Sequence, residues 1–89
     1  MAKKRRKLNK DFEKKIYSLK KNVELVLAKI YDIDDEDIQK EYMSAFNRVV
    51  YLYDVLKEDY EQKGYYEFSE ELLTNYIKAF NLFESEFEI

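Results

Sequence analysis

FEKKIYSLKKNVELVLAKI, residues 12–30, is the stretch that decides the fold. Its apolar residues recur at alternating intervals of four and three, at Phe12, Ile16, Leu19, Val23, Val26 and Ile30. Because an α-helix has about 3.6 residues per turn, this spacing keeps the apolar side chains on one helical stripe. Asn9 is placed to cap the helix, and Asp11 suits its positive N-terminal end. We predict a first helix over residues 9–31.

Similar patterns predict two further helices. Asp34 or Asp35 can cap the second, over residues 35–63, and Gly64 can end it in a left-handed conformation. This helix has a face broad enough to touch two neighbours, formed by Ile38, Tyr42, Ala45, Phe46, Val49, Leu52, Tyr53, Leu56 and Tyr60. Ser69 is the expected cap of a third helix over residues 69–87. Around that cap, Phe68 and Leu73 have the spacing of a hydrophobic staple.

The composition also favours helices, since the 89 residues include no Pro and one Gly. A sheet protein of this size needs several tight turns, which depend on those residues. We predict an all-α fold, an antiparallel three-helix bundle (residues 9–89) with a flexible basic N-terminal arm (residues 1–8). The expected core includes Phe12, Ile16, Leu19, Val23, Val26, Ile30, Val49, Leu52, Leu56, Leu73, Phe80 and Phe83.

Charge is distributed unevenly along the chain. Residues 1–29 hold 11 Lys and Arg against 3 Asp and Glu, a balance of +8. Residues 30–89 hold 5 Lys and Arg against 16 Asp and Glu, a balance of −11. An asymmetry of this kind indicates an interaction tail.

The basic segment predicts non-specific nucleic-acid binding, because Lys and Arg on a mobile arm can follow phosphates and release counterions. The residues concerned are Lys3, Lys4, Arg5, Arg6, Lys7, Lys10, Lys14 and Lys21. A nuclear address, adhesion to an anionic membrane surface and a purely solubilising arm remain alternatives. No helix-turn-helix is present, and an acidic third helix would be repelled by phosphate.

The acidic remainder favours a different function, that of a helical regulator or inhibitor that binds a protein partner. Its expected contact surface consists of the tyrosines Tyr51, Tyr53, Tyr60, Tyr65 and Tyr66. We also expect a homodimer, because the apolar surface exceeds what three helices can bury. The asparagines inside the predicted helices are interpreted as surface residues, one of which can set the register of an oligomer: Asn22, Asn47, Asn75 and Asn81.

Catalysis and cofactor binding are not expected. The chain has no His and no Cys, which removes the commonest general base and the thiol ligands. Asp32 begins an acidic run that resembles a calcium loop, but Asp37 and Met43 stand where that loop needs Gly and Glu. We expect no metal, no cofactor, no small-molecule substrate, no membrane span and a cytoplasmic location.

Overall fold

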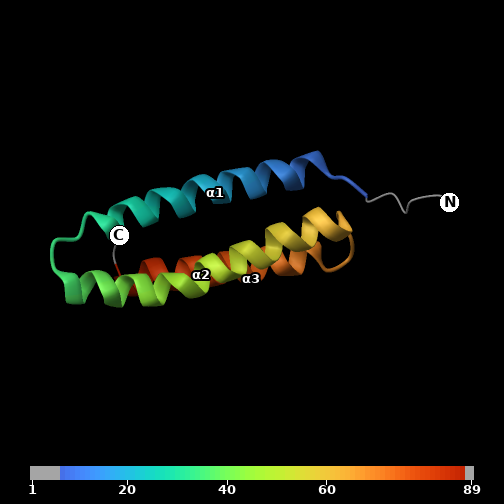
Figure 1. Cartoon of the computed structure of the whole chain (residues 1–89). Helices are drawn as coiled ribbons and strands as arrows, with labels where there is room; N and C mark the ends of the chain where they lie inside the picture. Colours follow the sequence, from blue (N-terminus) through green and yellow to red (C-terminus); the bar gives the residue numbers. More distant parts are fainter. Residues whose placement is uncertain (1–6, 88–89) are drawn as a thin grey trace.

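The structure, a computed structural model, describes residues 7–87 and consists of three helices joined by short connections (Figure 1). They are α1 (Lys10–Tyr31), α2 (Glu36–Lys63) and α3 (Ser69–Phe87). The molecule is elongated, with extents of 56 × 22 × 18 Å. The predicted all-α class with three helices is confirmed, and the predicted helix ends lie within one residue of the observed ones.

Local side-chain chemistry sets the ends of the first two helices as predicted. The Asn9 side chain accepts a hydrogen bond from the Phe12 amide at 3.0 Å and caps α1. Asp35 caps α2 by accepting from the amides of Asp37 and Ile38. Gly64 ends α2 with φ 75° and ψ −160°. That region is open essentially to glycine alone, and its extended ψ differs from the left-handed helical value we expected.

The predicted staple at the start of α3 is wrong. Phe68 is exposed and packs its ring against Tyr66. Ser69 is buried as the first residue of the helix, and its hydroxyl points back into the connection. It accepts from the Tyr66 amide at 3.0 Å and donates to the Gly64 carbonyl at 3.5 Å. The serine therefore stabilises the α2–α3 connection, while the Phe68 carbonyl accepts the first helical bond, from the amide of Leu72.

Aromatic rings from different helices meet along the core. Phe12, near the start of α1, contacts Tyr60, near the end of α2, with ring centroids 5.4 Å apart. Tyr42, near the start of α2, contacts Phe87, at the end of α3, at 4.8 Å. The chain therefore reverses its direction at each connection, and Figure 1 shows α1 on one side of the overlapping pair α2 and α3.

Most of the predicted core is buried, and three members are half-buried at its margin: Leu19, Leu52 and Phe80. Four aromatic residues outside that core list are buried as well, three from the broad face predicted for the second helix and one from the third helix: Phe46, Tyr53, Tyr60 and Tyr76. Their rings fill the broad space between α2 and its two neighbours, a volume that the aliphatic stripe alone would leave empty.

The first and third helices are held apart, although α2 packs against both. In the described residues, no Cα atom of α1 lies within 8 Å of a Cα atom of α3. A groove of about 430 Å³ separates them. The bundle is thus centred on α2, with a groove left between α1 and α3.

Tyr76 lies fully buried beneath this groove, and its hydroxyl has no hydrogen-bond partner among the described residues. Burial raises the pKa of the Tyr76 hydroxyl, and the nearby Tyr53 and Glu84 raise it further. A buried donor without a partner costs about 1–3 kcal/mol. We therefore expect Tyr76→Phe to increase the free energy of unfolding by about 1 kcal/mol in a urea titration at neutral pH.

Tyr60→Phe is the matched control, because the Tyr60 hydroxyl donates to Glu13 and accepts from the Asn9 amide. The same chemical change there should lower stability by about 1 kcal/mol. Because folding raises the pKa of Tyr76, the unfolded chain releases the hydroxyl proton first, and the free energy of unfolding falls as the pH rises above about 10. Tyr76→Phe should reduce that alkaline loss. A Tyr76→Phe variant less stable than the parent would contradict the claim that the Tyr76 hydroxyl is buried without a hydrogen-bond partner.

Candidate nucleic-acid interface

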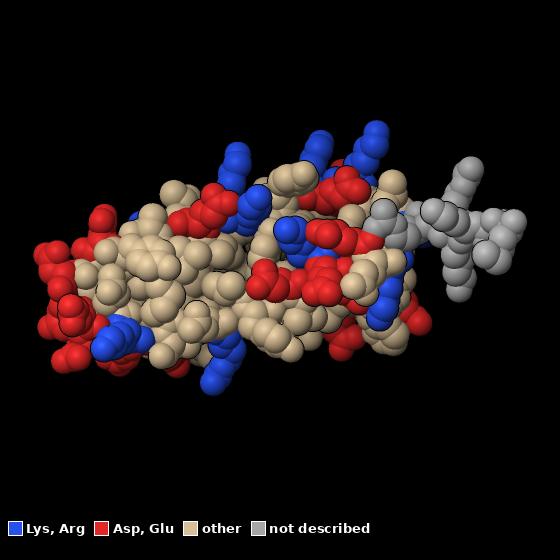
Figure 2. Space-filling model, in the orientation of Figure 1, with Lys and Arg blue, Asp and Glu red and all other residues tan. Residues whose placement is uncertain are grey.

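Lys10, Lys14 and Lys21 lie on the outward face of α1. Intervals of four and seven residues place these lysines above one another, opposite the buried stripe of the helix. All three are exposed. Figure 2 shows Lys and Arg side chains projecting along the edge of the molecule that α1 forms.

These lysines form a row that is free to meet an anion. The row spans about 16 Å along the helix, at about 1.5 Å per residue. Within residues 7–87 both ion pairs lie on α2, where Lys57 pairs with Glu61 at 3.9 Å and Lys63 with Asp59 at 3.3 Å. The lysines of α1 therefore keep their charge available to an external partner such as a phosphate backbone.

Packing fixes the end of α1 from which the basic arm departs. The buried Phe12 ring contacts both Tyr60 and Tyr65, with centroids 5.4 and 5.1 Å away. The Tyr60 hydroxyl donates to Glu13 Oε1 at 2.7 Å and accepts from the Asn9 amide at 3.1 Å. Sequence reasoning missed this arrangement, because nothing in the local pattern pairs residues about fifty positions apart.

Lys7, the last cation of the predicted arm, lies against the α2–α3 connection. Its carbonyl accepts a hydrogen bond from the Tyr65 amide at 2.6 Å, and its backbone forms a parallel bridge with Gly64. The Lys7 side chain itself is exposed. The other arm cations of the prediction, Lys3 to Arg6, lie outside the described residues.

Two of the tyrosines predicted to form a protein contact surface are buried inside the bundle. Tyr53 and Tyr60 are 6% and 8% exposed, because α1 covers Tyr60 and the ring of Tyr53 packs against Tyr76. Their expected role on an exposed surface is therefore wrong. The helical repeat of α2 places Tyr53 and Tyr60 on the side that faces the core, whereas Tyr51 is exposed.

Tyr65 and Tyr66 are half-buried and held by carboxylates. The Tyr65 hydroxyl donates to Glu70 at 2.5 Å, and this bond raises the pKa of Tyr65. Burial raises the pKa of Tyr66, helped by its bond to Asp59 at 3.1 Å. These bonds hold the α2–α3 connection in place and use the donor hydrogen of each hydroxyl.

The acidic run of residues 32–37 lies at the opposite end of the bundle, where Figure 2 shows Asp and Glu side chains gathered. Asp35 caps α2 there, and Glu36 and Asp37 occupy the first turn. Carboxylates at this position interact favourably with the helix macrodipole. In residues 7–87 no group of three Asp or Glu side chains is arranged to hold a metal ion.

Comparisons of the chain with protein-family models, with curated proteins and with solved structures found no match. Within the described part of the chain, no helix has the length and apolar character that crossing a membrane requires.

Proposed function

We propose that the protein is a non-enzymatic accessory protein that binds nucleic acid without sequence preference. Contact is made by the side chains of Lys3 to Lys7 and by the lysine row of α1, Lys10, Lys14 and Lys21. The helical body orients this basic end and carries an oligomerisation surface. The observation that supports the proposal best is the exposed, unpaired row on α1, which continues the cationic run of the sequence.

The charge of the rest of the molecule supports contact at one end only. Residues 30–89 have a balance of −11, and the acidic connection between α1 and α2 lies far from the basic end. Phosphate is repelled from that part of the surface. Because cations on an arm and on one helical row meet phosphates rather than base edges, we expect affinity to depend on charge and salt rather than on sequence.

Neutralising the lysine row tests its contribution. The triple variant Lys10→Gln, Lys14→Gln, Lys21→Gln should bind a labelled DNA duplex about tenfold or more weakly at about 100 mM salt, because counterion release is lost at each site. Fluorescence anisotropy measures this change. The matched control is Lys40→Gln, Lys57→Gln, Lys78→Gln, which removes the same charge from exposed positions on α2 and α3. Equal weakening by both triples would contradict the proposed interface.

An acidic regulator that binds a protein partner is the alternative function. Glu58 and Glu61 are exposed and suit a charge-reversal test, whereas Asp59 is half-buried and bonded to Tyr66 and Lys63. Under this alternative, reversing Glu58 and Glu61 would weaken partner capture, and neutralising the arm would not. Recovery of one protein partner that survives nuclease treatment would favour it over nucleic-acid binding.

A further inference from the structure

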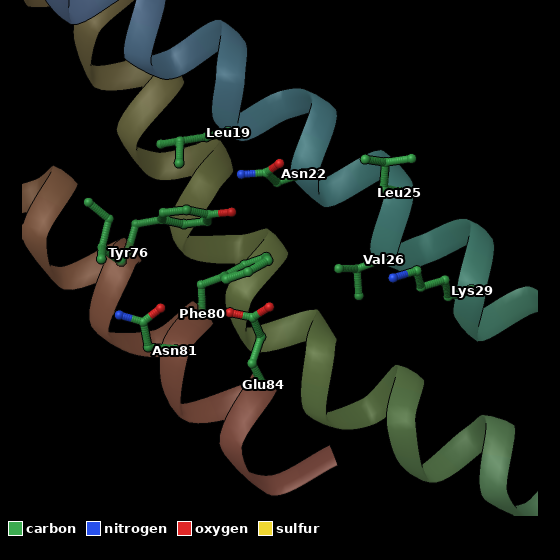
Figure 3. A pocket seen from close by; sticks show the side chains of 10 residues that line it. Leu19, Asn22, Leu25, Val26, Lys29, Tyr76, Phe80, Asn81 and Glu84 are labelled. Carbon is green, nitrogen blue, oxygen red and sulfur yellow. The ribbon is translucent and has the colours of Figure 1, made fainter. Parts of the chain in front are cut away.

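The groove between α1 and α3 is lined on both sides by residues that a closed three-helix bundle would cover. Leu25 on α1 and Ile77 on α3 stand at its edges, 62% and 41% exposed. Figure 3 shows Tyr76 and Phe80 lying between the two helices, and in the described residues no Cα atom of α1 lies within 8 Å of one of α3. Two splayed helices with apolar facing edges offer half of a four-helix arrangement.

The two edges of the groove differ in charge. Lys29 lies on the α1 edge and Glu84 on the α3 edge, and the two form no ion pair with each other across the groove. Asn22 and Asn81 line the groove from the same two helices (Figure 3). The α1 edge therefore carries an amide and a cation, and the α3 edge carries an amide and a carboxylate.

We infer that this groove is the contact face for a second copy of the chain. The twofold axis runs along the groove, so that α1 of each copy lies against α3 of the other. That orientation sets Lys29 of one copy toward Glu84 of the other and brings asparagine amides together. An axis across the helices would instead set each edge against its own copy and oppose like charges. The four helices then enclose the apolar edges, as in a four-helix bundle.

The asparagines Asn22 and Asn81 give this contact between copies a defined register. An asparagine inside an otherwise apolar helical interface favours the alignment in which its amide meets another amide. With α1 facing α3 of the partner copy, Asn22 of one copy meets Asn81 of the other, and the charges of Lys29 and Glu84 favour this orientation. This inference deepens the oligomerisation part of the proposed function. Its test measures mass and not nucleic-acid binding, so either proposal can fail without the other.

The first test is light scattering of the full chain at about 100 µM, a concentration at which a modest dimer forms by mass action. We expect the mass of two chains. Ile77→Glu should raise the dimer dissociation constant about tenfold or more, because it places a charge inside the contact. Leu82→Glu is the matched control on the opposite flank of α3, at a residue that is 59% exposed and outside the groove. The mass of one chain for the parent protein would overturn the inference.

Charge reversal tests the orientation with residues that are exposed in the single chain. Lys29→Glu should weaken the dimer, and the double variant Lys29→Glu, Glu84→Lys should restore it. Lys21→Glu, on the outward face, should leave the mass unchanged, and circular dichroism should show the same helical signal for every variant. Failure of the double variant to restore the dimer, or equal effects of Lys29→Glu and Lys21→Glu, would contradict the contact of α1 with the partner's α3.

Discussion

Replacing Lys3, Lys4, Arg5, Arg6 and Lys7 with glutamine should abolish detectable binding of duplex DNA at about 150 mM salt and leave the helical fold intact. At lower salt, where residual binding is measurable, the log–log slope of affinity against salt should fall. Each neutralised phosphate contributes about 0.9 to that slope, so loss of all five contacts reduces it by about 4 to 5. Anisotropy titrations at several salt concentrations measure both effects.

Side-chain replacement is a cleaner test than deletion of residues 1–7. The Lys7 carbonyl accepts from the Tyr65 amide at 2.6 Å, and Phe12 packs against the Tyr65 ring. Deleting Lys7 would remove that acceptor and loosen the α2–α3 connection, so lost binding would have two explanations. Glutamine keeps the backbone and removes only charge. Unchanged affinity and slope in the glutamine variant, with an intact helical signal, would show that the arm makes no phosphate contact.

Leu56→Ala should destabilise the fold by about 2–5 kcal/mol, because it leaves a cavity in a close-packed core. Leu56 is 1% exposed and lies on α2, the helix that packs against both others. Loss of the Leu56 side chain therefore weakens the packing of all three helices. Urea unfolding followed by circular dichroism measures the change.

Leu82→Ala provides the comparison for Leu56→Ala. Leu82 is exposed on α3, and its truncation should change stability by less than about 0.5 kcal/mol in the single chain. A cost below about 1 kcal/mol for Leu56→Ala would mean that the core around α2 is not packed as described.

The helices could be predicted because their signals are local. The spacing of Phe12, Ile16 and their successors on α1 follows the helical period, and the caps Asn9 and Asp35 act within three residues. Such signals need no knowledge of the partner surface. Ser69 shows their limit, since its hydroxyl bonds backward to Tyr66 and Gly64 instead of capping the helix that follows.

The role of the tyrosines was harder to predict, because a tyrosine is amphipathic and suits either a core or a surface. Tyr53 and Tyr60 face the core because α2 has neighbours on two sides, so a wide arc of that helix is covered. The sequence shows the breadth of the apolar face but not which edge each neighbour covers. The positions that α1 and α3 take on the face of α2 also determine how far apart these two helices lie, and therefore whether a groove forms between them.

The basic row of α1 could be predicted from the intervals between Lys10, Lys14 and Lys21, and the structure places all three in the open. The anchoring of Lys7 at the α2–α3 connection could not. It depends on Gly64 adopting φ 75° and ψ −160°, which sends the chain away from the helix and turns the Tyr65 amide toward the Lys7 carbonyl. That contact joins residues far apart in the sequence.

Gel retardation of the parent protein with duplex DNA, single-stranded DNA and RNA of unrelated sequences, at about 50 mM salt, tests the proposed function most directly. We expect retardation of nucleic acid with similar affinity for different sequences, and loss of retardation as the salt is raised to about 500 mM. Absence of retardation for all three nucleic acids at the lower salt would contradict nucleic-acid binding and leave the protein-partner alternative as the better account of the charged surface.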